Sequence, residues 1–332
     1  MARRADNRYL DPVSRAAEIA GDEASNVQAW AVAAVAATVA MWGYSAVAIK
    51  LVATSGLVVA FYRVWFAVPL LWLLAAAVPS MRGRLGRDWL RGCLVGGTLF
   101  GIHQVLFFSA MKMTSVANVT IIGALQPALV ALVAGPLFGE RVRRLSVGWA
   151  ALALLGTALV VLGSSGTPSA SLQGDVLAFV NLFAFTAYFL ASKRIREKVG
   201  SWEYVIGMST VSGFVVTAAV AATGPALAIP GFTDFVILMS LAIFPGTLGH
   251  VLTNWAHAHA SAFSISMMLL AVPVVSSISA TFVLGETLSP LQVVGGVVVL
   301  ASIAAVVATV AATAGEKAAD ELAESAAGTD AP

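Results

Sequence analysis

Long apolar stretches follow one another along almost the whole chain. Each is long enough to cross a bilayer core of roughly 30 Å as a helix of about 20 residues. The stretches are continuously apolar rather than alternating, which favours helices over the shorter strands of a membrane barrel. They lie near residues 29–51, 57–78, 91–111, 116–138, 146–163, 175–192, 205–223, 235–256, 261–284 and 291–312. The pattern predicts an all-α polytopic membrane protein with ten transmembrane helices.

Two of these stretches share a sequence signature that divides the chain into two repeats. "LQPALVALVAGPLFGE" ends at Glu140, and "AVPVVSSISATFVLGE" ends at Glu286, 146 residues later. Each copy has a proline, Pro127 or Pro273, thirteen residues before its glutamate. The copies lie in the fourth and ninth spans, and this offset of five spans means that the second copy enters the membrane from the opposite side. Inverted repeats of this kind are the usual architecture of secondary transporters.

Composition supports the membrane assignment, and charge orients it. The chain is 59% hydrophobic and 11% charged, with a mean hydropathy of +0.89, whereas a soluble domain carries about 25% charged residues. The connections after the second, fourth and sixth stretches hold Arg82, Arg84, Arg87, Arg91, Arg141, Arg143, Arg144, Lys193, Arg194, Arg196 and Lys198. The positive-inside rule therefore predicts that both termini are cytoplasmic. The connection between the eighth and ninth stretches departs from this pattern, because it holds His257 and His259 but no Lys or Arg.

The expected organisation has five parts. Residues 1–28 are a cytoplasmic N-terminal tail, because acids mixed with arginines exclude a cleavable signal peptide. The Ala/Glu-rich residues 313–332 are a cytoplasmic C-terminal tail, disordered or weakly helical. Between them lie two five-helix repeats, 29–163 and 174–312, joined by an extracytoplasmic linker at 164–173. The plasma membrane is the expected location.

Several functional classes lose support from what the sequence lacks. The single cysteine, Cys93, excludes an internal disulfide framework. No GxxxxGK[ST] phosphate loop occurs, which argues against ATP-driven transport by this chain alone. No HExxH motif, Cys/His cluster or nucleophile elbow is found, so no metal, cofactor or enzymatic activity is expected. The basic residues are scattered between spans and do not indicate a nucleic-acid partner.

The chain resembles the drug/metabolite transporter superfamily, of the type built from two EamA domains. The resemblance covers roughly 30–312 and is carried by Trp42-Gly43, Lys50, Pro127, Gly139, Glu140, Lys193, Pro273, Gly285 and Glu286. It implies a ten-helix fold with an inverted pseudo-twofold, a central cavity, and export or uptake of small metabolites without ATP. Arg63 in the second span matches a basic residue that the family often has there, but the seventh span has none. The two halves of the cavity are therefore expected to differ electrostatically.

The expected function is a secondary transporter that exports amino acids, related metabolites or toxic compounds by alternating access around a midplane cavity. Its partners would be a small-molecule substrate and the lipid bilayer. Protons are a candidate coupling ion, although no carboxylate lies at mid-membrane to relay them. The sequence is compatible with a monomer and with a homodimer. The alternative is a membrane-embedded enzyme or a flippase acting on lipid-linked substrates.

Two midspan histidines are the sharpest candidates for substrate contact. Shifting by 146 residues places His250 opposite Gln104, next to His103, so the two imidazoles are nearly pseudo-symmetric. Each can contact substrate, relay protons, or hold neighbouring helices together. Further candidates for the substrate pathway are Gln104 beside His103, Asn254 on the face of His250, Asn181 and Tyr188 on a stripe of the sixth span, Trp42, Tyr44, Gln126 and Arg63. Arg63 either snorkels to the interface or attracts an anionic substrate.

The paired prolines and glutamates are expected to be structural or to act as hinges. Pro127 and Pro273 break backbone hydrogen bonds inside their helices, so each gives a static kink, a hinge, or free carbonyls for a substrate. Glu140 and Glu286 end their helices, where the helix dipole disfavours an anion. We expect them to accept hydrogen bonds from the start of the following span. Trp65 and Trp72 are expected to be interfacial anchors or packing residues.

Overall fold

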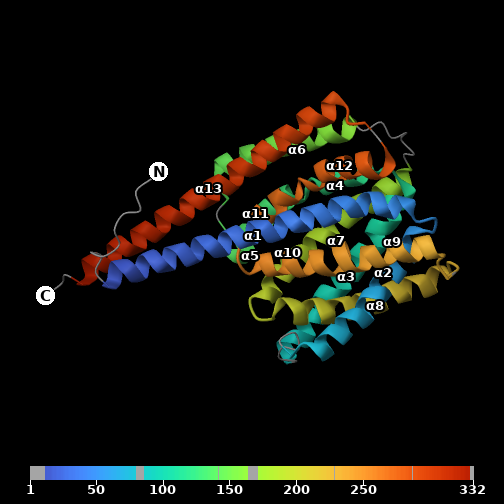
Figure 1. The fold of residues 1–332 in the computed structure, drawn as a ribbon, viewed down its shortest axis with the longest axis horizontal. Helices are drawn as coiled ribbons and strands as arrows, with labels where there is room; N and C mark the ends of the chain where they lie inside the picture. Colours follow the sequence, from blue (N-terminus) through green and yellow to red (C-terminus); the bar gives the residue numbers. More distant parts are fainter. Residues whose placement is uncertain are drawn as a thin grey trace.

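The architecture is a bundle of ten membrane-spanning segments (Figure 1). The computed structural model describes residues 12–79, 86–140, 142–163, 171–227, 229–285 and 287–329. Within these residues ten helical segments are long and apolar enough to cross a membrane, which confirms the predicted all-helical fold. They are α1 (Pro12–Leu51), α2 (Gly56–Ala77), α3 (Arg87–Met113), α4 with α5 (Val116–Gly123, Gln126–Phe138), α6 (Arg144–Leu162), α7 (Leu172–Arg196), α8 (Ser201–Thr223), α9 with the π-helix η3 and α10 (Phe232–Ile243, Phe244–Leu248, Gly249–His257), α11 with α12 (Ala262–Leu269, Val272–Leu284), and α13 (Pro290–Thr329).

The first and last helices are longer than the membrane requires. The span within α1 runs from Asn26 to Leu51, and the span within α13 runs from Pro290 to Thr309. The described parts of both predicted tails are therefore helical and continue these spans. In Figure 1 the two extensions project from the same end of the bundle. Residues 164–170 of the predicted linker lie outside the described residues.

The fourth and ninth spans are each divided into two helices. Pro127 is the second residue of α5, and Pro273 is the second residue of α12. A proline fits the first turn of a helix, because the amide hydrogen that it lacks has no intrahelical partner there. The prolines therefore do more than bend a continuous helix: each marks the start of a new one.

Both divided spans end at a glycine in the left-handed conformation. Gly139 has φ 68° and terminates α5, and Gly285 has φ 69° and terminates α12. Residues with a side chain rarely adopt this conformation, whereas glycine adopts it without steric cost. The shared Gly-Glu signature is thus in part a pair of matched helix stops.

The second helices of the two repeats, α2 and α8, run antiparallel. Trp65 Nε1 donates to Thr217 Oγ1 at 2.9 Å, and Trp72 Nε1 donates to Thr210 Oγ1 at 3.0 Å. Seven residues forward along α2 therefore correspond to seven residues backward along α8. Both tryptophans, expected to be anchors or packing residues, hydrogen-bond across the two repeats.

The last helices of the two repeats, α6 and α13, lie side by side and also run antiparallel (Figure 1). A Cβ built on Gly156 would lie 2.9 Å from the carbonyl oxygen of Gly295, and one built on Gly163 would lie 2.6 Å from Ser289 Oγ. Residue numbers therefore rise along α6 while those of its contacts fall along α13, so the two helices run in opposite directions. Two pairs of equivalent helices with opposed directions confirm the predicted inverted repeat.

Candidate functional site

A cavity lies where the two repeats meet. It holds about 160 Å³ of water-accessible space and is lined by residues from both repeats, including the breaks in the fourth and ninth spans. Such an apolar pocket with a few convergent polar groups is the usual form of a small-molecule site. Seven of the predicted substrate-pathway residues line it: Trp42, Arg63, His103, Gln104, Gln126, Asn181 and His250. Their role in transport stays a prediction, but the structure brings them together.

The other candidates lie elsewhere. The Tyr44 hydroxyl pairs with Ser240 Oγ at 2.9 Å, and Tyr44 is not among the described residues that line the cavity. Tyr188 and Asn254 stand behind the cavity wall, where they contact His250. Of the paired prolines, Pro273 lines the cavity, whereas Pro127 does not belong to its described lining. Glu286 lies outside the described residues.

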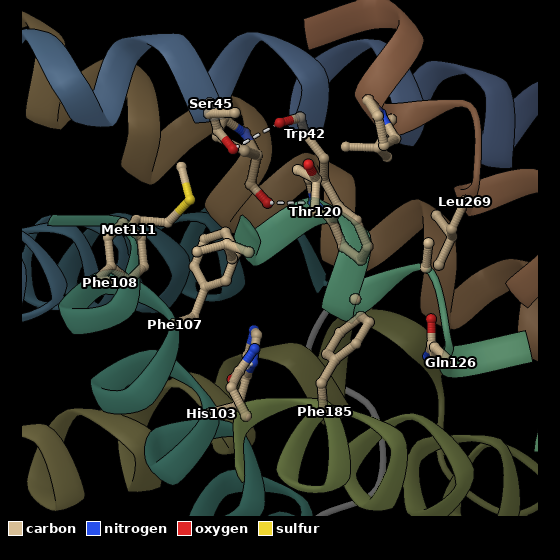
Figure 2. Close-up of a pocket in the computed structure, with 18 of the residues that line it drawn as sticks. Trp42, Ser45, His103, Phe107, Phe108, Met111, Thr120, Gln126, Phe185 and Leu269 are labelled. Carbon is tan, nitrogen blue, oxygen red and sulfur yellow. Dashed lines mark hydrogen bonds between the residues drawn. The ribbon is translucent and has the colours of Figure 1, made fainter. Parts of the chain in front are cut away.

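His103 is held from behind by the sixth span. Its Nδ1 lies 2.7 Å from Asn181 Oδ1. Because an amide oxygen only accepts, Nδ1 carries the proton in this arrangement. The imidazole also packs against the Phe185 ring, which is tilted by 34° to it, with ring centroids 4.7 Å apart. Figure 2 shows His103 and Phe185 reaching from α3 and α7 toward Trp42 on α1. The contact with Asn181 thus fixes the orientation of the ring.

His250 is the last acceptor in a chain of hydrogen bonds that runs from Asn254 through Tyr188. Asn254 Nδ2 donates to Tyr188 Oη at 3.3 Å, and Tyr188 Oη lies 3.2 Å from His250 Nδ1. Since the Tyr188 hydroxyl accepts from Asn254, its own proton is available for His250 Nδ1, which then accepts. Phe100 lies between the two histidines, 4.5 Å from the His250 ring and 6.0 Å from the His103 ring. Tyr188 and Asn254 therefore position His250 and do not line the cavity themselves.

A proline in the eighth span opens the helix beside the cavity. Pro245 lies in the π-helix η3 and lines the cavity. Its carbonyl oxygen accepts from Trp42 Nε1 at 3.2 Å, so the break is tied to the first span. Gly249 permits this approach, because a Cβ there would lie 2.8 Å from Trp42 Nε1. π-helical turns of this kind are frequent at functional sites.

Arg63 does not snorkel to the interface. Its residue is 6% exposed, and it lines the cavity. Its Nε donates to the carbonyl oxygen of Leu241 at 3.4 Å. Leu241 needs such a donor, because Pro245, four residues later, has no amide hydrogen to offer it. Arg63 Cζ also lies 5.3 Å from the centre of the Phe108 ring, a cation–π contact.

The breaks in the fourth and ninth spans lie at the cavity. Pro127 cannot donate to Gly123, four residues before it, and Pro273 cannot donate to Leu269. Gly123 and Leu269 are separated by the repeat interval of 146 residues, and both line the cavity. The residues that lose these donors therefore lie at equivalent positions of the two repeats in the cavity wall.

The prediction that Glu140 accepts hydrogen bonds from the start of the following span is wrong. Its Oε1 accepts from the Ala262 amide at 2.8 Å and its Oε2 from the Phe263 amide at 3.3 Å, so Glu140 caps α11 and not the following span. Lys193 Nζ adds an ion pair with Oε1 at 3.3 Å. The inverted fold places the end of α5 against the start of α11, where a carboxylate is favoured by the free amides and the helix dipole. This geometry is consistent with a structural role.

Sequence reasoning missed several residues of the cavity. Phe107, Phe108 and Met111 of α3, Thr120 of α4 and Ser266 of α11 line it, although no motif marks them. They lie close to His103 or to the helix breaks along the chain, so a search of helical neighbours would have found some of them. Pro245 has a clearer signal, since "FPGTLGH" places a proline and two glycines in the middle of a span.

Comparison with known proteins agrees with the geometry. The model of the EamA-like transporter family matches this chain twice, over residues 29–162 and 172–308. The chain belongs to the EamA-like transporter family. As an EamA-like transporter with ten apolar helices, it is a multi-pass membrane protein. The family assignment points away from an enzyme.

Relatives of this EamA-like protein are known as transporters without a stated substrate. An uncharacterized transporter of Archaeoglobus fulgidus is 28% identical over 261 residues, 74% of this chain and 85% of the relative. A second one from that organism is 24% identical over 282 residues, 82% and 94% of the two chains. The uncharacterized transporter YyaM of Bacillus subtilis is 26% identical over 212 residues, 62% and 68%. A protein of known crystal structure has the same fold, with a TM-score of 0.67 at 20% identity over 84% of this chain and 96% of its own.

Proposed function

We propose that this protein is a secondary transporter of the plasma membrane that exports small metabolites through the cavity between its repeats. The observation that carries the proposal is the position of this cavity: both repeats line it, and both divided spans break beside it. Transporters with inverted repeats bind their substrates at such an interface of discontinuous helices. Amino acids, related metabolites and toxic compounds of similar size are the candidate cargoes.

Alternating access is the mechanism that this arrangement favours. The cavity-lining residues of α1 and α3 belong to the halves of these helices that end at the α1–α2 and α3–α4 connections. At the opposite ends, Glu140 ties α5 of the first repeat to α11 of the second. Rocking of one repeat against the other would have to break these Glu140 contacts. Protons are a candidate coupling ion through His103 and His250.

Charge supports an orientation with the Glu140 end in the cytoplasm. Described basic residues gather at this end of the bundle: Arg87, Arg91, Arg143, Arg144, Lys193, Arg194, Arg196 and Lys198. The positive-inside rule places such a cluster in the cytoplasm, with both termini. The cavity-lining halves of α1 and α3 then lie toward the outside. Whether the protein works as a monomer or as a homodimer does not enter this proposal.

Counterflow in liposomes tests the proposal. The purified full-length protein is reconstituted with a panel of unlabelled metabolites inside and trace labelled metabolite outside. A carrier accumulates label transiently against its gradient when the same metabolite is trapped inside, and His103→Ala together with His250→Ala reduces this accumulation. Chemical conversion without flux would instead favour the membrane-embedded enzyme, and transbilayer movement of lipid alone would favour a flippase.

A further inference from the structure

We propose that the cavity binds a small carboxylate with an apolar, flat body, whose carboxylate pairs with Arg63. The proposal rests on the transport function above and names the chemical class of the cargo. It is carried by three features of the described residues: an uncompensated buried cation, hydrogen-bond donors without partners, and a wall of aromatic rings that leads away from the cation.

Arg63 has no counter-charge within the described part of the chain. No aspartate or glutamate belongs to the described lining of the cavity. The ion pairs found among the described residues join Lys193 to Glu140 and Arg194 to Glu197. A buried cation at membrane depth is costly unless an anion or several acceptors compensate it. Among the described residues the guanidinium is met by the Leu241 carbonyl and the Phe108 ring, and a bound carboxylate would supply the missing negative charge.

The guanidinium of Arg63 keeps most of its donors for a ligand. A guanidinium has five N–H groups, and within the described residues only Nε of Arg63 is hydrogen-bonded, to the Leu241 carbonyl. Its two terminal nitrogens match the two oxygens of a carboxylate in a bidentate pair. Gln104 Nε2 and Gln126 Nε2 are also buried without a hydrogen-bond partner in the described structure, and both residues line the cavity. The cavity thus holds donors that have no partner among the described residues and can receive an anionic head group.

Aromatic rings continue from Arg63 across the cavity. Phe108 lies against the guanidinium, and its ring centroid is 5.5 Å from that of Phe107. The wall then passes through His103, 5.5 Å from Phe107, to Phe185 and Trp42. Figure 2 shows Phe107, His103, Phe185 and Trp42 converging on one space. Rings around a small volume favour a flat apolar body by burial and by edge or face contacts.

The same features disfavour cationic cargo. A cation in this space would meet Arg63 with no carboxylate to offset the repulsion, in surroundings of low dielectric constant. A lipophilic amine is therefore excluded as a preferred ligand.

Three one-ring probes of equal size test the inference. Phenylacetate, phenylacetamide and phenethylamine carry charges of −1, 0 and +1 at neutral pH. Binding to the purified full-length protein is measured by calorimetry. A charge-assisted pair predicts that phenylacetate binds about tenfold or more tightly than phenylacetamide, and that phenethylamine binds most weakly. Arg63→Gln should remove the preference, and Arg63→Lys should keep part of it. Arg194→Gln, which removes an exposed cation of α7, is the control and should change nothing.

Each outcome decides the point. Equal binding of phenethylamine and phenylacetate, no binding of phenylacetate, or a preference that survives Arg63→Gln overturns the inference. If Arg63→Gln does not fold, Gln104→Leu replaces it, because it removes a donor and leaves the Arg63–Leu241 bond in place. Carboxylate-selective binding without counterflow would refute the transport function and leave the site standing. Counterflow of a metabolite without an Arg63-dependent carboxylate preference would support the transport function and refute the carboxylate site.

Discussion

Lys193 Nζ lies 3.3 Å from Glu140 Oε1, and this ion pair joins the two repeats. Lys193 belongs to the last turn of α7, and Glu140 follows the glycine that ends α5. The ammonium also donates to the Ala260 carbonyl at 2.8 Å. In the first repeat, Lys50 at the end of α1 donates to the Thr114 carbonyl at 3.1 Å. Thr114 and Ala260 are separated by the repeat interval, so a lysine closes the equivalent connection at each membrane face.

Glu140→Gln should destabilise the protein by about 1–3 kcal/mol. The amide keeps the shape of the side chain but removes the charge that accepts from the amides of Ala262 and Phe263 and that pairs with Lys193. Both side chains are mostly buried, at 13% and 15% exposure, so solvent screens the loss only weakly. Unfolding in detergent measures the change in free energy.

Glu197→Gln is the matched control for this prediction. Glu197 pairs with Arg194 at 3.4 Å, but the two side chains are 47% and 68% exposed. An exposed pair contributes between zero and about 1 kcal/mol. Equal losses for Glu140→Gln and Glu197→Gln would show that the cap on α11 does not stabilise the fold.

Tyr188→Phe should weaken transport more than it weakens the fold. The change leaves Asn254 Nδ2 with the His250 carbonyl as its remaining partner and removes the donor to His250 Nδ1. Side-chain hydrogen bonds between membrane helices contribute about 0.6–2 kcal/mol, so a folded protein is expected. The freed imidazole can then turn, because the bond that fixes its orientation is lost.

Counterflow and thermal unfolding of Tyr188→Phe are measured together. Transport should fall several-fold while the melting temperature drops by only a few degrees. Thr223→Val, which removes an exposed hydroxyl bonded within α8, serves as the control. Unchanged counterflow in a folded Tyr188→Phe protein would mean that the orientation of His250 does not matter for transport.

Gly295→Ala should destabilise the contact between α6 and α13. The new Cβ would lie 2.6 Å from the Gly156 carbonyl oxygen and 2.7 Å from the Val160 amide nitrogen, and neither backbone atom can move alone. Overpacking of this kind costs about 1–3 kcal/mol. Gly148→Ala on α6 is the matched control, since a Cβ there meets nothing within 4 Å. Alanine is also the better helix former, so Gly148→Ala should hold or raise the unfolding free energy, and a loss equal to that of Gly295→Ala would refute the packing argument.

The sequence predicts the fold well because membrane topology follows from local properties. Apolar length gives the ten spans, and the duplicated proline and Gly-Glu pair reveal the repeat. Pro127 and Pro273 also predict the helix breaks, because a proline removes a backbone hydrogen bond within its own helix. Most of the proposed polar cavity residues follow as well, since a polar side chain in a span must face protein or water.

The contacts between helices are harder to predict, because they depend on how the repeats meet. Glu140 was assigned to the next span, but its partner lies 122 residues away on α11. Tyr44 was placed in the cavity with Trp42, yet two residues along a helix point in different directions, and Tyr44 reaches Ser240 of α9 instead. The hydrogen bond from Arg63 to the Leu241 carbonyl joins the two repeats, so no local sequence pattern predicts it.

Cysteine labelling of the two ends of α7 tests the orientation. The single cysteine, Cys93, is buried and is first replaced by serine, whose hydroxyl can still donate to the Tyr204 carbonyl. Gln173 lies in the first turn of α7 and Lys198 lies two residues after its end. Both are exposed, so each is changed to cysteine in this background. A membrane-impermeant maleimide should label Gln173→Cys in intact cells and Lys198→Cys only after permeabilisation. The reverse pattern would invert the proposed orientation. Labelling of both from one side would mean that α7 does not cross the membrane, and the opposed polarity of the repeats would then have no basis.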